Sequence, residues 1–267
     1  MAQESIVDTS RPNAGRIYDY LLGGSHNFEV DRQAAEHLRS MLPFVDKAAR
    51  FQRWALQDVA KELVERRSYD VIIDFASGLP TNDHIHYVVP NGTTVIYSDY
   101  DPVVVEYAHE ILAGTPNVYY FQADARQPDK LLRRPDVETI LQGRRDVGIV
   151  LWGVSGFLSD QDLHYIAQTL YNWSGDKSCL VYNAQGADAR TDDPAMARVH
   201  KIYEQMGTTT HFHTLEKTLE MLQPWHPDAN GFISLLEWHG FDRSEVAQDE
   251  ARAYEQSGGG YGAYLVK

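Results

Sequence analysis

The chain has 267 residues, of which 43% are hydrophobic, enough for one large α/β domain with a substantial core. Its 38 Asp and Glu residues outnumber 24 Lys and Arg residues, and the formal charge of -14 disfavours nucleic acid or an anionic membrane surface as a partner. The N-terminus lacks the pattern of a signal peptide, and no run reaches the roughly 18 apolar residues of a membrane helix. With a single cysteine, Cys179, we expect a cytoplasmic protein.

Helical periodicity comes first along the chain. Apolar residues repeat at helical spacing from Val30 to Met41 and again from Phe51 to Leu63, with Pro43 between the two runs. We therefore predict an N-terminal helical extension over residues 1–68. The rest of the chain, residues 69–267, is predicted to form one α/β domain.

Short β-rich runs then alternate with helical patterns. This alternation predicts a mostly parallel, Rossmann-like sheet flanked by helices. The five predicted strands cover residues 71–75, 94–98, 118–122, 147–152 and 178–183.

Several helices in this part carry recognisable end signals. Pro102 stands at the first turn of one, and Ser159 is the expected N-cap of another. Further helices are expected over residues 192–206 and 214–222. The run of glycines before Ala263 predicts a turn and then a last strand, half of an antiparallel hairpin.

Three acidic residues occupy the ends of the first three predicted strands. Asp74 lies late in the first strand, and Asp99 and Asp124 follow the next two, each 25 positions after the one before. Ligands of open α/β sheets bind at the carboxyl ends of the strands. Because a carboxylate offers two acceptor oxygens, Asp99 suits the two ribose hydroxyls, and Asp124, followed by Ala125, suits an adenine amine. One such Asp is often only a turn or helix cap, but three together indicate a nucleoside site.

The first of these loops, residues 74–81, is poor in glycine. Ala76 and Pro80 stand where a dinucleotide-binding fingerprint would have glycine, which disfavours NAD. A nucleoside with an amino-acid tail needs only a tight turn at Gly78 and room beside small residues such as Ala76 and Ser77. The loop therefore favours S-adenosylmethionine, with an NAD-dependent oxidoreductase as a weaker alternative.

The sequence resembles the class I methyltransferases, and within them a bacterial S-adenosyl methyltransferase family that is common in actinobacteria and was formerly described as a domain of unknown function. The resemblance rests on RIYDYLLGGSHNF at residues 16–28, GLPT at 78–81, DYDP at 99–102 and GGYG at 259–262. It implies S-adenosylmethionine as methyl donor and S-adenosylhomocysteine as product. The predicted cofactor-binding residues are Tyr18, Tyr20, Gly23, Asn27, Asp74, Ala76, Ser77, Gly78, Asp99, Tyr100, Asp124, Ala125 and Trp152.

The motif at residues 16–28 concentrates aromatic and hydrogen-bonding groups between two helical segments. We predict that it forms a lid over the cofactor, with Tyr18 or Tyr20 facing the sulfonium through a cation–π contact worth about 0.5–2 kcal/mol. Gly23 would allow close approach of the backbone, and Asn27 would bind the cofactor. In the alternative interpretation, the tyrosines only pack and the glycines end a helix.

Methyl transfer from a sulfonium depends mainly on alignment, so a protein base is optional. His26 is the first candidate for one, because its loop should face the site. The pair His84 and His86 should point in different directions on one helix. His211 and His213 have strand spacing, but without a third ligand we predict no metal site.

Aromatic residues are candidates for the walls of the acceptor pocket. Phe157 follows the fourth strand, where many methyltransferases contact the acceptor, and Trp225 and Trp238 lie in the region with the weakest resemblance. The predicted function is methyl transfer by in-line displacement to a small, aromatic type of secondary metabolite. The alternative function is a non-catalytic module that binds the cofactor. The sequence is compatible with a monomer or a homo-oligomer.

Overall fold

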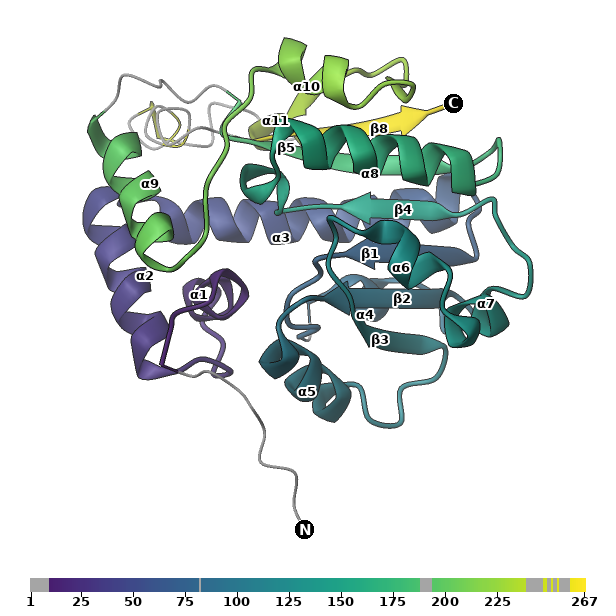
Figure 1. The fold of residues 1–267 in the computed structure, drawn as a ribbon, viewed down its shortest axis with the longest axis horizontal. Helices are drawn as coiled ribbons and strands as arrows, with labels where there is room; N and C mark the ends of the chain where they lie inside the picture. The colour runs from purple at the N-terminus through teal and green to yellow at the C-terminus, as the bar shows by residue number, and fades with distance from the viewer. Residues whose placement is uncertain are drawn as a thin grey trace.

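The computed structural model describes residues 10–81, 83–187, 194–238, 247–248, 251, 254 and 260–267. A central sheet runs through these residues in the order β3-β2-β1-β4-β5-β8-β6, and β7 also pairs with β8 (Figure 1). The strands are β1 (Val71–Phe75), β2 (Thr94–Asp99), β3 (Val118–Gln122), β4 (Gly148–Leu151), β5 (Cys179–Gln185), β6 (His226–Pro227), β7 (Ile233–Ser234) and β8 (Gly260–Val266).

The first five strands are parallel, and the chain reverses its direction of progress across the sheet between β3 and β4. Strands β2 and β3 extend from one side of β1, whereas β4 and β5 extend from the other. A crevice therefore opens at the carboxyl ends of β1 and β4, the place where ligands bind in open α/β sheets.

Helices cover both faces of the sheet. Alternate residues of each strand face opposite sides, so Ile72 and Val150 belong to the core under α3, whereas Ile73 and Ile149 belong to the core under α8. The helices are α1 (Ala14–Leu21), α2 (Glu29–Met41), α3 (Val45–Lys61), α4 (Ile85–Val88), α5 (Pro102–Ile111), α6 (Pro128–Leu132), α7 (Pro135–Leu141), α8 (Asp160–Trp173), α9 (Pro194–Gln205), α10 (Leu215–Met221) and α11 (Leu235–Trp238), with a π-helical turn η1 (Glu62–Arg66) and a 3₁₀ turn η2 (Ser155–Phe157).

The N-terminal helices divide between two cores. Helix α3 buries Ala55, Leu56 and Val59 against the sheet. Helices α1 and α2 instead form a smaller core with α9, in which Ile17 and Ile202 are buried. The predicted extension thus shares the main core through α3, and only α1 and α2 stand beside it (Figure 1).

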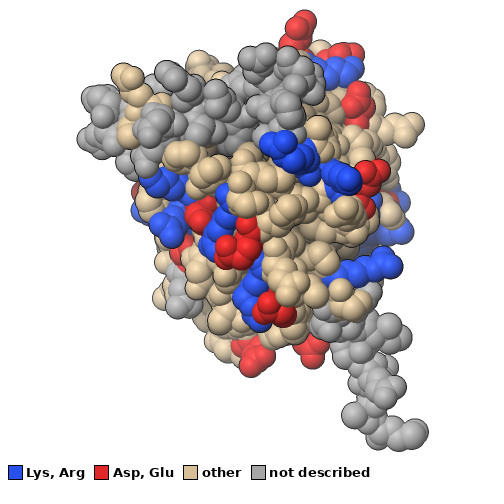
Figure 2. Space-filling model, turned by 90° about the vertical axis from the view of Figure 1, so that its left-hand side faces the viewer, with Lys and Arg blue, Asp and Glu red and all other residues tan. Residues whose placement is uncertain are grey.

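Basic and acidic side chains are interspersed on the side of the molecule seen in Figure 2. Arg32 and Glu29 form such a pair on α2 at 2.9 Å, and Arg39 of α2 pairs with Asp46 of α3 at 2.8 Å. Among the described residues no helix has the length and apolar composition needed to cross a membrane.

The predicted fold class is confirmed. All five predicted strands are present to within two residues, Pro102 begins α5, and Ser159 caps α8 in a capping box with Asp162. The antiparallel last strand is present as β8, but it pairs with β5, β6 and β7, which lie well upstream in the chain. The predicted glycine turn before it, and the start of the helix predicted from residue 192, lie outside the described residues.

Candidate functional site

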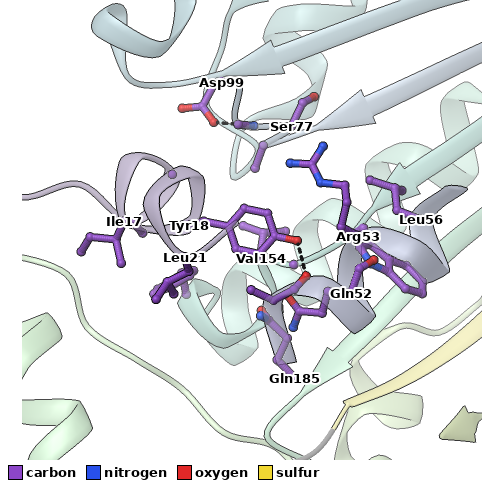
Figure 3. Close-up of a pocket in the computed structure, with 18 of the residues that line it drawn as sticks. Ile17, Tyr18, Leu21, Gln52, Arg53, Leu56, Ser77, Asp99, Val154 and Gln185 are labelled. Carbon is purple, nitrogen blue, oxygen red and sulfur yellow. Dashed lines mark hydrogen bonds between the residues drawn. The ribbon is translucent and has the colours of Figure 1, made fainter. Parts of the chain in front are cut away.

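A cavity of about 240 Å³ lies at the carboxyl ends of β1, β2 and β4, under α1 and against α3. Figure 3 shows Asp99 and Ser77 on one side of it and Tyr18, Gln52 and Gln185 on the other. We call the first side the polar end, formed by Arg53, Asp74, Ser77, Gly78, His84 and Asp99. We call the second side the apolar end, formed by Ile17, Tyr18, Leu21, Val45, Phe157 and Tyr203 with the amides of Gln52 and Gln185.

The loop after β1 turns sharply and is tied to β2. Ala76 and Gly78 both have left-handed backbone conformations, with φ values of 54° and 63°. The Ser77 amide donates to the Ser98 carbonyl at 2.8 Å, and the Ser77 hydroxyl donates to the Asp74 carbonyl at 2.7 Å. The sharp turn predicted at Gly78 is thus present, and the loop forms one wall of the cavity.

Asp99 is the best-held acid of the site. One carboxylate oxygen accepts from the Gly78 amide at 3.1 Å and the other from the Asp101 amide at 3.0 Å. Burial raises the pKa of Asp99 to about 6, although these amides favour its charged form. Each oxygen keeps a second lone pair, so the carboxylate can still accept from two hydroxyl groups.

An ion-pair cluster fixes α1 beside this edge. Arg16 is 2% exposed, and it donates to Asp31 at 2.9 Å and to Asp101 at 3.0 Å. Asp31 belongs to α2, and Asp101 caps α5 directly after β2. The cluster therefore joins both N-terminal helices to the strand end that carries Asp99.

Arg53 and Asp74 bring polar atoms without hydrogen bonds to the polar end. The contacts of these atoms with charged or titratable groups are long, 3.7 Å from Arg53 Nη1 to Asp83 Oδ1 and 3.9 Å from Asp74 Oδ2 to His84 Nε2. Arg53 is 3% exposed and Asp74 is 2% exposed, yet Nε and Nη1 of the arginine and Oδ2 of the aspartate make no hydrogen bond in the described structure. Burial raises the pKa of Asp74 to about 8, and the charge of Arg53 opposes this shift only in part. Buried polar groups normally have partners, so these atoms indicate a ligand with an anionic and a cationic group.

Two histidines meet one tyrosine next to this pair. His84 Nδ1 lies 3.1 Å and His86 Nδ1 lies 3.0 Å from the Tyr97 hydroxyl. The expectation that they point apart on one helix is therefore wrong, because His84 precedes α4 as its N-cap. His84 Nδ1 accepts from the Ile85 amide at 2.9 Å, which leaves Nε2 to donate to the Ser77 carbonyl at 3.1 Å. Burial lowers the pKa of His84 well below 6.5, so the ring is neutral with both nitrogens engaged.

Side chains from α1, α3 and α9 close the apolar end. Tyr18 lies with its ring 5.4 Å from the Arg53 guanidinium carbon, and its hydroxyl donates to the Ala49 carbonyl at 3.0 Å. Phe157 and Tyr203 contact each other edge to face, with ring centroids 5.2 Å apart. A protein cation thus already occupies one face of the Tyr18 ring, the aromatic group predicted to face the sulfonium.

The structure brings most of the predicted strand-end residues together. The predicted residues that line the cavity are Tyr18, Asp74, Ala76, Ser77, Gly78, Asp99, Tyr100, Trp152 and Phe157. Those that lie outside its lining are Tyr20, Gly23, His26, Asn27, Asp124, Ala125, Trp225 and Trp238.

The polar groups of the N-terminal motif bind one another. Asp19 accepts from the His26 amide and the Asn27 side chain, both at 2.9 Å. A Cβ atom on Gly24 would lie 2.1 Å from this carboxylate, so only glycine fits there. The His26 ring packs on Tyr107 of α5 with centroids 5.1 Å apart. These residues order the turn between α1 and α2 and lie away from the cavity.

Tyr20 and Asp124 also have protein partners. Tyr20 donates to Glu36 at 2.9 Å, on the side of α1 that faces α2. Both carboxylate oxygens of Asp124 accept from Arg126, at distances from 2.7 to 3.0 Å. The adenine role of Asp124 stays a prediction, with its carboxylate engaged in this surface pair.

Neither of the two tryptophans proposed for the pocket lines the cavity, since Trp225 is buried in the core and Trp238 is half-buried against it. Trp225 is 2% exposed, and its indole donates to the Ala167 carbonyl at 3.0 Å on the α8 side of the sheet. Trp238 packs against Trp152, with centroids 5.6 Å apart, so it supports a cavity residue without lining the cavity. The Trp152 indole in turn donates to the Gln52 carbonyl at 3.0 Å.

Sequence reasoning missed Arg53, Gln52, Gln185 and Tyr203. A signal for Arg53 exists, because it follows Ala49 by four residues and precedes Leu56 by three, and a charge on the apolar stripe of a helix needs a partner. Gln185 at the end of β5 follows the same strand-end rule as the three acids. Tyr203 reaches the site through α9, whose position depends on tertiary packing.

Comparison with known structures gives the same architecture over nearly the whole chain. A candidate methyltransferase from Thermobifida fusca YX matches with a TM-score of 0.85 and 27% identity, covering 97% of this chain and 96% of that chain. A DUF574 family protein from Streptomyces avermitilis matches with a TM-score of 0.84 and 22% identity, covering 97% and 99%. The plantazolicin methyltransferase BamL, solved with S-adenosylhomocysteine, shares only the fold, with a TM-score of 0.51, 12% identity and coverage of 95% and 96%.

The sequence of the chain also shows which protein family it belongs to. No curated protein sequence matches the chain. The model for S-adenosyl methyltransferases matches residues 1–262, which is nearly the full length. The chain therefore belongs to the S-adenosyl methyltransferase family, and its methyl donor is S-adenosylmethionine.

Proposed function

We propose that the chain transfers the methyl group of S-adenosylmethionine to a small metabolite, with the donor in the polar end of the cavity and the acceptor in the apolar end. The observation that carries this proposal is that Arg53 and Asp74, two buried residues of opposite charge type with atoms that make no hydrogen bond, both line one cavity. The amino-acid tail of the donor carries a carboxylate and an ammonium group. Arg53 would hold the first and Asp74 the second.

The rest of the polar end fits the nucleoside part of the donor. Asp99 would accept hydrogen bonds from the ribose hydroxyls, and Tyr100 and Asn13, which are joined by a 3.3 Å hydrogen bond, line the mouth beside it. When bound, the donor supplies an electrophilic methyl group and a good leaving group. The protein then has to align the acceptor and exclude water.

The apolar end supports an aromatic acceptor, because Phe157, Tyr203 and Tyr18 offer flat surfaces there. We propose a role in secondary metabolism in the cytoplasm, with His26 not needed as a base. Its ring packs on α5, away from the cavity. A non-catalytic binding module is the competing function, since the polar end alone explains binding without turnover.

Turnover separates these two functions. The protein is incubated with methyl-labelled S-adenosylmethionine and a metabolite extract of the organism that encodes it. An enzyme gives a labelled small molecule, and Asp99→Ala, which weakens donor binding, loses the product. Donor binding without any labelled product in repeated extracts would support the binding module.

A further inference from the structure

The apolar end of the cavity is distinguished by its lack of charge. Among the described residues that line the cavity, the Arg, Asp and His side chains, namely Arg53, Asp74, His84 and Asp99, all belong to the polar end. The two tyrosines of the apolar end are neutral. Burial raises the pKa of Tyr203 to about 12 and also raises that of Tyr18. A charged acceptor would therefore lose its hydration there without gaining a counter-ion.

Two neutral amides supply the polar contacts of this end. The Gln185 side-chain oxygen accepts from the Gly156 amide at 3.3 Å, and the Gln185 backbone amide donates to the Ser155 hydroxyl at 2.9 Å. Gln52 belongs to α3, and its backbone carbonyl accepts a hydrogen bond from the Trp152 indole at 3.0 Å. Figure 3 shows both amide side chains near Val154 and below the Tyr18 ring. An amide can donate and accept, so the pair can orient a polar atom of a bound molecule without charge.

Two glycines lie beside these amides. A Cβ on Gly153 would be in van der Waals contact with the Gln52 oxygen at 3.8 Å, and one on Gly156 would be in contact with the Gln185 oxygen at 3.7 Å. Gly153 also has a φ of 73°, which disfavours any side chain. Gln52 and Gln185 therefore line the cavity beside two glycines, Gly153 of the loop after β4 and Gly156 of η2.

From these observations we infer that Gln52 and Gln185 determine specificity for an uncharged, flat acceptor, such as a neutral nitrogen heterocycle, in the apolar end. This inference rests on the proposed function, because it assigns the polar end to the methyl donor. The aromatic walls hold the ring, and the amides select against ionised groups. A carboxylate acceptor would instead need Arg53, which the donor tail occupies.

Binding of three probes with one ring system tests the inference. Quinoline is neutral near pH 7, quinoline-3-carboxylate is anionic, and 3-(aminomethyl)quinoline is cationic. Dissociation constants are measured by ligand-observed NMR on the full chain saturated with S-adenosylhomocysteine. We expect quinoline to bind at least about tenfold more tightly than either charged probe. Tighter binding of the carboxylate, or equal binding of all three, would overturn the inference.

Isosteric variants assign the selectivity to the two amides. Gln52→Glu and Gln185→Glu each place an anion in the apolar end, so each should shift the preference at least about tenfold toward the aminomethyl probe. Gln205→Glu is the matched control, because Gln205 is exposed on α9 and should leave the preference unchanged. An unchanged preference in both site variants would show that Gln52 and Gln185 do not determine the specificity of the apolar end.

Calorimetry with S-adenosylhomocysteine on the same samples keeps the two proposals apart. If this ligand does not bind the wild-type chain, the proposed function fails. If it binds with equal affinity to the wild type and the two glutamate variants while the probe preference does not follow charge, only the further inference fails. Thermal unfolding of each variant confirms that the compared proteins are folded.

Discussion

The strand-end edge of the cavity and the N-terminal motif at residues 16–28 differ in how their residues reach the site. At the strand ends, Asp74, Ala76, Ser77, Gly78 and Asp99 all line the cavity. In the motif, only the side of α1 that carries Ile17, Tyr18 and Leu21 does so. Parallel strands deliver every following loop to one edge, whereas a helix presents its residues to several neighbours. Some residues of a motif on a helix therefore line the cavity, whereas the others contact the neighbouring helices that hold it in place.

We expect substitution of Arg16 to have the largest effect on stability, because its ion pairs join the N-terminal motif to the end of β2. Arg16→Met leaves Asp31 and Asp101 buried without their cation, and breaking such a buried pair costs about 3–5 kcal/mol of unfolding free energy. Urea denaturation measures this loss. Arg66→Met is the control, because Arg66 is exposed and its pair with Glu62 should contribute at most about 1 kcal/mol. Equal small losses in both variants would show that the cluster does not hold α1.

Arg53 tests the contribution of α3 to the polar end. Arg53→Met removes a charged hydrogen-bond donor from the amino-acid tail, and we expect affinity for S-adenosylhomocysteine to fall about 10- to 100-fold. Isothermal calorimetry gives the dissociation constants. Arg50→Met, at an exposed position of the same helix, should bind like the wild type. If Arg53→Met binds equally well, the tail contacts another group.

Asp74 gives the binding reaction a pH signature. Because burial raises its pKa from 3.8 to about 8, the empty site holds a proton at pH 7, and a bound ammonium group should expel it. Calorimetry in buffers with different ionisation enthalpies should therefore detect release of up to about one proton with the wild type and none with Asp74→Asn. Identical heats in all buffers for the wild type would contradict this role.

The same pKa shift affects stability. The folded protein holds the Asp74 proton over a pH range in which the unfolded chain has lost it. The free energy of unfolding should therefore fall as the pH rises from about 4 to about 8. Asp74→Asn should flatten this part of the profile in urea denaturation. A profile of the same slope in the variant would assign the pH dependence to other groups.

The smallest effect is expected at Asp124. Its carboxylate is held by Arg126 at the surface and lies outside the cavity lining, so Asp124→Asn should change affinity for S-adenosylhomocysteine by less than about threefold. Asp99→Asn, at the neighbouring strand end, serves as the contrasting variant with a larger loss. A tenfold or greater loss with Asp124→Asn would restore its predicted contact with adenine.

The contrast between the two regions also explains what could be predicted from the sequence. Strand periodicity and the acids at 74 and 99 located the edge of the site, because a parallel sheet fixes where its loops meet. The side of α1 that faces the cavity depends on packing against α2, where Arg39 and Glu36 meet Tyr20. No spacing rule contains that information.

The residues that reach the cavity through the packing of one helix were the hardest to predict from the sequence. Arg53 enters the site from α3 because the apolar stripe of that helix packs on the sheet. Tyr203 enters because α9 joins the small core of α1 and α2. Each depends on a tertiary arrangement that local patterns do not specify. For these two residues, the isolated charge on the apolar stripe of α3 was the single local signal.

A crystal structure with S-adenosylhomocysteine tests the central claim most directly. We predict that the carboxylate of the tail lies within hydrogen-bonding distance of Arg53. The ammonium group should contact Asp74, and the ribose hydroxyls should contact Asp99. The apolar end between Gln52 and Gln185 should remain free for the acceptor. A ligand whose tail lies in the apolar end and makes no contact with Arg53 or Asp74 would contradict the assignment of the two ends.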